Sequence, residues 1–412
     1  MSLSPIGGVT LQRLQVIYKT VERCNLACPY CYYFYGSDQS YKDRPARTRI
    51  AVVDALCDFL IQGVEDADIA GIDLIFHGGE PMLQRLADFE ESCRRLRDRV
   101  GTLTTLRLSI QTNGTKLDEA WLGALKRHGV RLGVSLDGPD EIHDKNRVYH
   151  NGKGSFADIA ARLHRVRQAD PDYYDNCVGS LTVLDAHQNY RDIVSYFYSE
   201  LHLRQQSFLL PDCTHDDGIP GGLSARDYGH ALCGIFDQWL EQPGLQIREI
   251  EKILRCFQKA SFYDTPETVG LVDGRRVIDN QVIVVQSDGA IKVDDSYIPA
   301  EIWRSQAPVR NIQDTSLANY VTHAFFDEFH DARQTPPTAC KACMWVNICR
   351  GGDVENRWST ERRFDNPSVF CESLQIFYEH VVRYLVTNGY PLQDIYRRLA
   401  DGPRGEDFGY AA

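Results

Sequence analysis

The sequence predicts an α/β fold, in which a partial (β/α)6 TIM barrel is followed by a C-terminal α+β domain. Strand and helix patterns alternate from residue 14 to about residue 212, and this regularity stops near residue 222. Such alternation indicates a parallel sheet with right-handed crossovers, and six units are fewer than the eight of a complete barrel. Cysteines also gather at two places, one in each part of the chain.

Short apolar runs mark the strands of the barrel, and apolar residues at helical spacing mark the helices between them. The strands are expected at residues 14–20, 72–76, 106–110, 132–136, 178–184 and 207–210. The helices are expected at residues 49–63, 83–98, 118–128, 155–168 and 189–201, with Asp118 as an N-cap. In such folds the chemistry gathers where the strands end.

The part of the chain after residue 222 has fewer regular patterns. Helices are expected at residues 224–262 and 373–387, and segment 277–293 is typical of a β-hairpin with its turn at Asp288-Gly289. We therefore divide the chain into an N-terminal segment (1–13), the barrel (14–222), a helical bridge (223–275), the α+β domain (276–390) and a C-terminal tail (391–412).

The composition limits the function classes. The chain has 412 residues and a formal net charge of −12, without a basic stripe, so a nucleic-acid partner is not expected. No run of 18 apolar residues occurs, and the first 15 residues lack the pattern of a secretion signal. We therefore expect no membrane partner and a cytoplasmic location. In a reducing cytosol, 13 cysteines indicate metal binding or catalysis rather than disulfides.

The first cysteine group, Cys24, Cys28 and Cys31, has the spacing C-x3-C-x2-C. Three thiolates from one short loop can hold three irons of a 4Fe–4S cluster and leave the fourth iron open for a ligand. Structural zinc is the alternative, although zinc sites usually combine C-x2-C pairs with a second pair or histidines.

The second group supplies four thiolates, which is enough to saturate one 4Fe–4S cluster. Its members are Cys340, Cys343, Cys349 and Cys371. Zinc is a stronger alternative here because C-x2-C is a common zinc pair. The remaining six cysteines are isolated and are expected to be small core residues. They are Cys57, Cys93, Cys177, Cys213, Cys233 and Cys256.

The first cysteine loop and the strand ends resemble those of the radical S-adenosylmethionine (SAM) superfamily. The loop C-x3-C-P-Y-C is followed by HGGEP after the second strand, QTNG after the third and SLDGP after the fourth. The resemblance implies that SAM chelates the open iron, and that its reductive cleavage gives a 5′-deoxyadenosyl radical that abstracts hydrogen. The residues expected to bind the cofactor are Tyr30, His77, Gly78, Gly79, Glu80, Asn113, Ser135, Asp137 and Arg147.

The second cysteine group resembles the SPASM extension of peptide-modifying radical SAM enzymes, which in many relatives holds two auxiliary clusters. The hairpin here reads SDGAIKVDD without cysteine, and Asp353 stands where a further cysteine is expected. We infer that one auxiliary cluster is lost and one is kept. A remnant site with Asp294, Asp295 or Asp353 as an iron ligand is an alternative.

The start VIYKTVERCNLACPYCYYF and the GGD after Cys349 most resemble maturases that form cyclophane cross-links in ribosomally made peptides. The resemblance implies a precursor peptide substrate, an electron donor such as flavodoxin or ferredoxin, and a carboxylate base. Asp294, Asp295 and Asp212 are the candidate bases. Alternatives are an anaerobic sulfatase maturase, whose relatives usually keep both auxiliary clusters, thioether formation, epimerisation, and a non-catalytic iron–sulfur or zinc scaffold.

Overall fold

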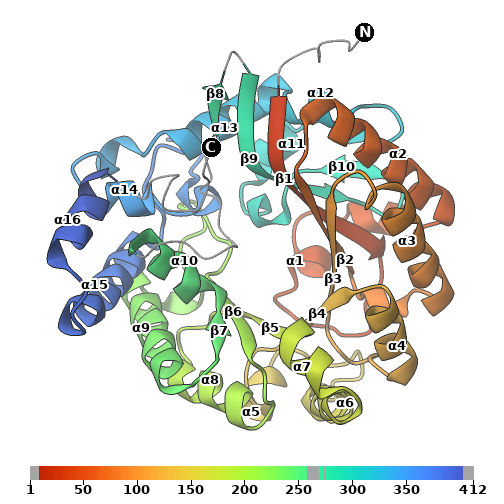
Figure 1. The fold of residues 1–412 in the computed structure, drawn as a ribbon, viewed down its shortest axis with the longest axis horizontal. Coiled ribbons are helices and arrows are strands. Elements are labelled where there is room, and N and C mark those ends of the chain that lie inside the picture. The colour runs from red at the N-terminus through yellow and green to blue at the C-terminus, as the bar shows by residue number, and fades with distance from the viewer. Residues whose placement is uncertain (1–8, 258–268, 273–274, 402–412) are drawn as a thin grey trace. The chain divides into compact units, whose positions relative to one another are not determined.

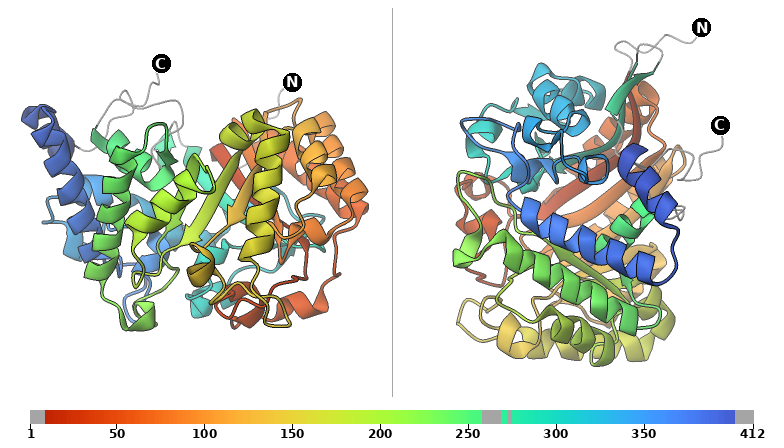
Figure 2. Two further views of the ribbon diagram at one scale, coloured as in Figure 1. Left: turned by 90° about the horizontal axis from the view of Figure 1, so that it is seen from below. Right: turned by 90° about the vertical axis from the view of Figure 1, so that its left-hand side faces the viewer.

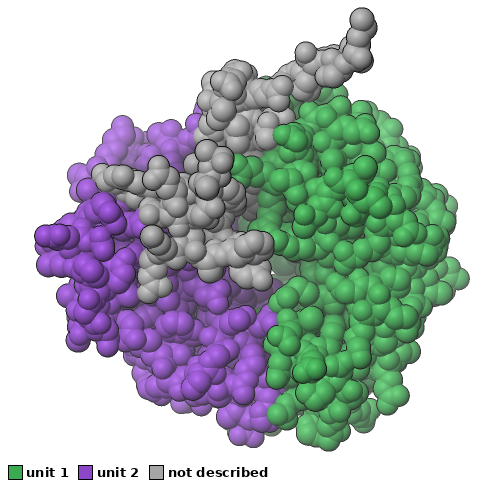
Figure 3. Space-filling view, viewed as in Figure 1, with its two compact units in different colours: residues 1–180, 268–327 green, residues 181–267, 328–412 purple. Residues whose placement is uncertain are grey.

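The computed structural model describes residues 9–257, 269–272 and 275–401. The chain forms two compact units, one of residues 1–180 and 268–327 and the other of residues 181–267 and 328–412 (Figure 3). The units are groups of residues that contact one another in the folded chain, so they do not test the domain boundaries inferred from the sequence, which remain predictions. The predicted α/β class with a parallel-stranded barrel sheet is confirmed.

The first unit is built around a sheet in the order β11-β10-β9-β1-β2-β3-β4. Figure 1 labels its strands from β10 to β4. The strands from β9 to β4 run parallel where neighbours pair, whereas β10 and β11 are antiparallel additions. The strands are β1 (Val9–Val21), β2 (Gly71–Gly78), β3 (Thr105–Thr112), β4 (Val130–Ser135), β8 (Val269–Val272), β9 (Arg275–Val285), β10 (Ala290–Lys292) and β11 (Arg310–Asn311). Strand β5 (Val178–Val183) begins in this unit and ends in the second.

Helices α2, α3 and α4 cover the outer face of strands β1–β4 (Figure 1). The side chains of β2 alternate between two faces: Ile72, Leu74 and Phe76 are buried on one face, while Asp73 and His77 lie on the other. The apolar face is the one that the helices can cover. The helices of this unit are α1 (Tyr32–Tyr35), α2 (Ile50–Ala67), α3 (Leu86–Arg99), α4 (Glu119–Arg127), α5 (Asp140–His143), α6 (Phe156–Ala169), α7 (Pro171–Cys177), α11 (Glu301–Ser305) and α12 (Leu317–Val321).

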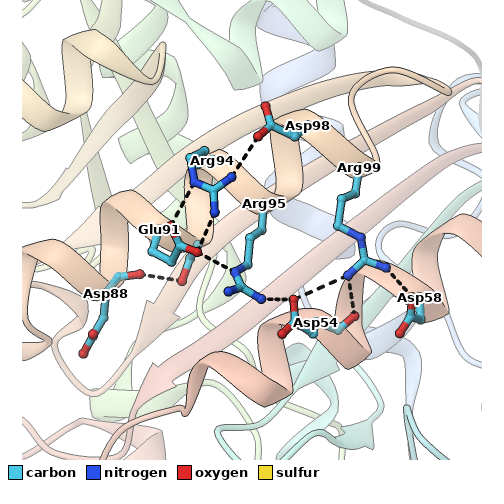
Figure 4. A network of polar contacts seen from close by, with 9 residues as sticks. Asp54, Asp58, Asp88, Glu91, Arg94, Arg95, Asp98 and Arg99 are labelled. Atoms are coloured by element: carbon cyan, nitrogen blue, oxygen red, sulfur yellow. Dashed lines mark hydrogen bonds and ion pairs between the residues drawn. The ribbon is translucent and has the colours of Figure 1, made fainter.

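A network of ion pairs joins α2 to α3 on the surface of the first unit (Figure 4). Arg95 binds Asp54 of α2 and also Glu91 one turn away, at 2.7 Å, while Arg99 binds Asp54 and Asp58. Each of these exposed pairs contributes about 1 kcal/mol or less, because water screens them. The apolar faces therefore supply most of the α2–α3 packing energy.

The second unit contains strands β6 and β7 and a layer of helices. Helix α15 packs against α9, and Figure 2 shows the two side by side. The elements are β6 (Gln205–Leu209), β7 (Gln246–Ile247), α8 (Tyr190–Ser199), α9 (Ala225–Glu241), α10 (Arg248–Phe257), α14 (Val346–Cys349), α15 (Cys371–Thr387) and α16 (Leu392–Asp401). Helix α13 (Asp327–Gln334) begins at the last residue of the first unit.

Three predicted elements need correction. The helical segment expected at 224–262 is divided into two helices, α9 and α10, because Pro243-Gly244 lies between them and Gly244 adopts φ +74°. Residues 258–262 lie outside the described residues. Strand β1 starts at Val9 rather than residue 14, since β9 pairs with it from that residue on. The expected tail 391–412 contains helix α16, and residues 402–412 again lie outside the described residues.

The predicted β-hairpin is confirmed, with β9 and β10 antiparallel around Asp288-Gly289 and Gly289 at φ +85°. In the described part of the chain, no helix has the length and apolar character needed to cross a bilayer.

The predicted N-cap of α4 is confirmed, because the Asp118 side chain accepts a hydrogen bond from the Trp121 N–H at 2.9 Å. We expect Asp118→Ala to lower the free energy of unfolding by about 1 kcal/mol, since one N–H at the start of the helix loses its partner. Urea denaturation followed by circular dichroism measures this change. Asp118→Ser, which keeps an oxygen acceptor, is the control and should stay close to the unsubstituted protein.

Candidate functional site

The first cysteine group lies in the loop that follows β1. The Cys31 N–H donates to the Cys28 carbonyl at 3.0 Å, which folds the loop back on itself. The three thiols are close enough to repel one another as anions, and burial is the largest cause that raises the pKa of Cys24 to about 12 and that of Cys28 to about 11. Such thiols ionise when a cation binds them, so the loop fits an iron–sulfur cluster.

Two donors point at the sulfur of Cys24. The Leu26 N–H lies 3.4 Å from Sγ, and the amide of Asn113 lies 3.7 Å from it. Asn113 is held in place because it also binds Asn25 at 3.1 Å and accepts from the Thr115 hydroxyl at 2.7 Å. Asn113, expected to bind the cofactor, thus reaches the cysteine loop itself. Hydrogen bonds to a ligating sulfur raise the reduction potential of a cluster.

Gly78, the last residue of β2, and Gly79, which follows it, let two segments of the protein approach closely. A Cβ on Gly78 would lie 2.2 Å from the Val21 carbonyl oxygen, and one on Gly79 would lie 2.3 Å from that of Arg23. Gly78 also adopts φ +138°, which favours glycine. The sequence suggested that these glycines approach a ligand. In the structure, the space left by their missing Cβ atoms is instead taken by the backbone of Val21 and Arg23, which leads into Cys24.

Glu80 is buried and its carboxylate already binds three protein donors. Oε1 accepts from the Met82 N–H at 2.8 Å and the Thr112 hydroxyl at 2.6 Å, and Oε2 accepts from the Asn113 N–H at 2.7 Å. Burial raises the pKa of Glu80, and these donors oppose that rise. The side chain therefore ties the end of β2 to the end of β3, and Oε2 keeps a lone pair for a cofactor ammonium.

Tyr30, Asp137 and Arg147 come together beside Cys28. The Tyr30 hydroxyl donates to Asp137 at 2.7 Å, Nε of Arg147 donates to the same carboxylate at 2.7 Å, and the guanidinium lies 5.5 Å from the Tyr30 ring centre. Although burial opposes its charge, Asp137 raises the pKa of Arg147, so the guanidinium stays ionised. Tyr30 as a residue remains 45% exposed, which leaves an aromatic surface for a ligand.

Ser135 and the segment after β4 complete this side of the site. The Ser135 hydroxyl accepts from Gln111 at 2.8 Å. Buried His143 contacts the Ser155 hydroxyl at 3.1 Å, and Ser155 donates to the Arg147 carbonyl at 2.6 Å. His143 and Ser155 therefore position the backbone of Arg147. Sequence reasoning missed Gln111 and Ser155, because neither pairing is local.

The four cysteines of the second group line one cavity in the second unit, together with Gln375 and Tyr378 of α15. Burial raises the pKa of Cys349 to about 11, and it also raises the pKa values of Cys340 and Cys371. Gln375 lies 3.5 Å from the sulfur of Cys371, and the Tyr378 hydroxyl is hydrogen-bonded to Cys349. The shared cavity and the sulfur-directed donors fit a cluster held by four thiolates.

All 13 cysteines lie in the described part of the chain, and each has a free thiol there. Three of the isolated cysteines, Cys57, Cys93 and Cys213, are buried as expected, whereas the other three are partly exposed. Among the described residues, no three His, Cys, Asp or Glu side chains converge as closely as the ligands of a single metal ion do.

Comparisons with known proteins agree with this geometry. Residues 18–195 match the family model of the radical SAM superfamily. The chain contains a radical SAM domain. The protein is therefore an enzyme whose cofactors include a 4Fe–4S cluster and SAM.

The similarity to curated relatives extends beyond the radical SAM domain. The cysteine-type anaerobic sulfatase-maturating enzyme of Clostridium novyi is 26% identical over 86% of this chain and 91% of its own length. The serine-type enzyme of Bacteroides thetaiotaomicron is 23% identical over 88% of this chain and 87% of its own length. The solved structure of native anSMEcpe with bound AdoMet and the Cp18Cys peptide has a TM-score of 0.72 at 24% identity, and the match covers 91% of this chain and 98% of that one. Because the identity to anSMEcpe is 24%, this match supports the fold alone.

A buried ion pair joins the radical SAM domain to the segment after β10, and the sequence analysis found only one of its two partners. Asp295 follows β10 and pairs with Lys19 of β1 at 2.5 Å, and the Tyr32 hydroxyl donates to Asp295 at 3.1 Å. His77 lies beside this pair, with Nδ1 3.5 Å from the Lys19 amine. Lys19 was missed because nothing in a strand sequence distinguishes a buried lysine from an exposed one.

The other two candidate bases have different surroundings. Asp294 accepts from the Ser296 N–H at 3.1 Å and caps the turn at 295–297, and burial raises its pKa. Asp212 is exposed and belongs to the second unit. Asp353, the alternative iron ligand, pairs with Lys252 at 3.6 Å. Of the three candidate bases, Asp295 is the one held among residues of the radical SAM domain.

We expect Gly79→Ala to displace the loop that carries Cys24, because the new methyl group would meet the backbone of Arg23. Iron bound per chain after anaerobic reconstitution should fall, and the absorption of the first cluster should decrease. Gly71→Ala, at the start of β2, is the control, since its Cβ would lie 3.7 Å from the nearest atom. Equal iron content in the two variants would contradict this role of Gly79.

Proposed function

We propose that this protein modifies a side chain of a peptide by radical SAM chemistry, in an oxidation that removes two electrons from the substrate. The observation that carries this proposal is the presence of two gathered cysteine sets, one of three thiols and one of four. A cluster held by three thiolates leaves an iron for SAM, whereas one held by four can accept an electron. The names of the full-length relatives and the peptide bound to anSMEcpe support this substrate class.

The roles of the cysteines follow from this proposal. Cys24, Cys28 and Cys31 hold the cluster that binds SAM, and the four thiols of the second cavity hold one auxiliary cluster. When bound, the reduced cluster and SAM together supply a 5′-deoxyadenosyl radical, which removes a hydrogen atom from an unactivated carbon. Gln375 and Tyr378 donate hydrogen bonds to auxiliary sulfurs, which favours acceptance of an electron at that site.

Residues around Cys28 bind and orient SAM. Arg147 uses Nε for Asp137, so Nη1 and Nη2 remain to bind a carboxylate in a bidentate manner. The exposed face of Tyr30 offers a stacking surface for adenine, and Ser135 and Asp137 offer polar contacts to ribose or amino groups. The backbone of Gly78 and Gly79, with Glu80, lies next to the same loop and offers acceptors for the ammonium of SAM.

Asp295 is the base that takes a proton from the substrate. Burial works against its ionisation, but Lys19 beside it keeps the pKa of Asp295 below its usual value, so the carboxylate is ready to accept a proton at neutral pH. Asp294 does not suit this task, because its carboxylate caps a turn and burial favours its neutral form.

The modification we favour is a cyclophane cross-link between an aromatic ring carbon and a Cβ atom. The pattern of the first cysteine loop and the two aspartates at the hairpin, where two-cluster relatives carry cysteine, support it. The second candidate is formylglycine formation, which the sulfatase-maturating relatives favour. Both reactions remove one hydrogen atom through the 5′-deoxyadenosyl radical and then one electron and one proton, so the same base serves either one.

Mass spectrometry of a precursor peptide encoded beside this gene, after anaerobic co-expression, tests the proposed function. We expect a loss of two hydrogen atoms and no fragment ions between the two joined residues. A product on a single cysteine or serine that reacts with a hydrazide reagent would favour formylglycine instead. An unmodified peptide from active, iron-loaded enzyme, together with an unmodified sulfatase peptide, would contradict the proposal.

We expect Cys28→Ala to abolish formation of 5′-deoxyadenosine, because the SAM-binding cluster loses one of its three ligands. Cys343→Ala removes a ligand from the auxiliary site and should leave 5′-deoxyadenosine formation intact while product is lost. Anaerobic incubation with SAM and dithionite, followed by chromatography, measures both variants.

Cys57→Ala is the control, since Cys57 is buried in α2 and belongs to neither cysteine set. Metal analysis completes the test. About eight irons per chain support two 4Fe–4S clusters, about twelve would contradict the loss of one auxiliary cluster, and about four with zinc would make the second site structural. A fully active Cys28→Ala variant would overturn the assignment of the first site.

A further inference from the structure

Lys19 is a lysine with a fully buried side chain, and its amine is surrounded by polar and aromatic groups. The amine lies 2.5 Å from Oδ2 of Asp295 and 3.2 Å from the Tyr32 hydroxyl. It also lies 4.5 Å from the ring centre of Tyr33, within the range of a cation–π contact. Taking an ammonium out of water costs several kcal/mol, so the fold retains it only with compensating contacts. Asp295 supplies the opposite charge.

Asp295 faces titratable groups from each of the elements around it. Lys19 comes from β1, His77 from β2, Tyr32 and Tyr33 from α1, and Asp294 precedes it in the chain. Burial and the nearby Lys19 lower the pKa of His77 to about 3, so His77 is neutral at physiological pH. Burial also raises the pKa of Asp294, which reduces its negative charge. Among these neighbours, Lys19 is therefore the group whose positive charge faces Asp295.

The hydrogen bonds of Asp295 have a definite direction. Lys19 and Tyr32 both donate to Oδ2, and the Tyr32 hydroxyl in turn accepts from Lys19. Two donors on one oxygen fix the orientation of the carboxylate, and they leave Oδ1 as the oxygen free of these contacts. An oriented carboxylate with one oxygen available is what proton transfer from a positioned substrate requires.

We propose that Lys19 is a positioning residue that orients the Asp295 carboxylate and holds it ionised for proton transfer from the substrate. This inference rests on the proposed function of the site. The proton that leaves the substrate bonds to Asp295, and the electron released with it goes to an oxidised iron–sulfur cluster. Lys19 itself forms and breaks no bond with the substrate.

The role of Lys19 predicts a specific defect when its charge is removed. In Lys19→Met the apolar side chain fills similar space, but Asp295 stays buried and loses its counter-charge. A buried carboxylate without a partner takes up a proton near neutral pH. Hydrogen abstraction does not need the base, so 5′-deoxyadenosine should still form while product formation falls by about tenfold or more at neutral pH.

Infrared spectroscopy tests the proposal without a substrate. The probe is the protonated carboxyl band of Asp295, obtained for reconstituted enzyme as the difference between each protein and its Asp295→Asn counterpart. The unsubstituted enzyme should show carboxylate between about pH 6 and pH 9, and Lys19→Met should show protonated acid at the lower end of that range. A carboxylate of unchanged titration in Lys19→Met would overturn the proposal, whatever the natural substrate is.

Turnover of the precursor peptide gives the second test. The ratio of product to 5′-deoxyadenosine should fall in Lys19→Met, and it should recover toward high pH as Asp295 ionises. Lys19→Arg keeps the charge and should retain more product than Lys19→Met. Combining Lys19→Met with Asp295→Asn should cost no more than Asp295→Asn alone, because Lys19 acts through that carboxylate.

Lys292→Met is the matched control. Lys292 also belongs to the first unit and pairs with an aspartate, Asp38, together with the Ser40 hydroxyl at 2.8 Å. Its loss removes an ion pair of the same kind without touching Asp295, so the ratio and its pH dependence should not change. Equal falls of product and 5′-deoxyadenosine in Lys19→Met, with no pH recovery, would show a merely structural role. No turnover by the unsubstituted enzyme would count against the proposed function alone.

Discussion

The site depends on the backbone contact between the end of β1 and the end of β2. Beyond the parallel pairing of the two strands, the Gly79 N–H donates to the Val21 carbonyl at 2.7 Å and the Glu80 N–H donates to that of Arg23 at 2.8 Å. Only residues without a Cβ permit this approach. The contact fixes Cys24 relative to Glu80, and Glu80 fixes Asn113, which returns a hydrogen bond to the sulfur of Cys24. A closed set of contacts therefore holds the cysteine loop to the barrel.

The same part of the molecule buries charge in matched pairs. Arg147 faces Asp137 and Lys19 faces Asp295, each pair with side chains no more than 13% exposed. Glu80 instead relies on neutral donors. A carboxylate buried without such a partner tends to take up a proton rather than stay charged. Such pairs of buried charges gain little stability from the pairing itself, so their occurrence beside the cysteine loop is consistent with the proposed site.

The sequence was most informative where the signal is local. Strand–helix alternation predicted the barrel strands within a few residues, and the spacing of cysteines predicted which thiols gather. Nonlocal pairing limited the rest. The early start of β1 depends on β9, which lies more than 250 residues away in the chain. The pairing of Lys19 with Asp295 and the hydrogen bond from Asn113 to the sulfur of Cys24 join segments that meet only in the fold. No periodicity in the sequence reveals them.

The adjacent aspartates at the hairpin show how far local reasoning reaches. By sequence, Asp294 and Asp295 are equivalent acids directly after the hairpin. In the fold their environments differ, because Asp294 points to the backbone of Ser296 while Asp295 points to Lys19. Burial drives the pKa of Asp294 up, whereas Lys19 keeps that of Asp295 down. Environment separates the two neighbouring carboxylates into one that caps a turn and one that stays ionised beside Lys19, and for this reason we assign the proposed base to Asp295 rather than Asp294.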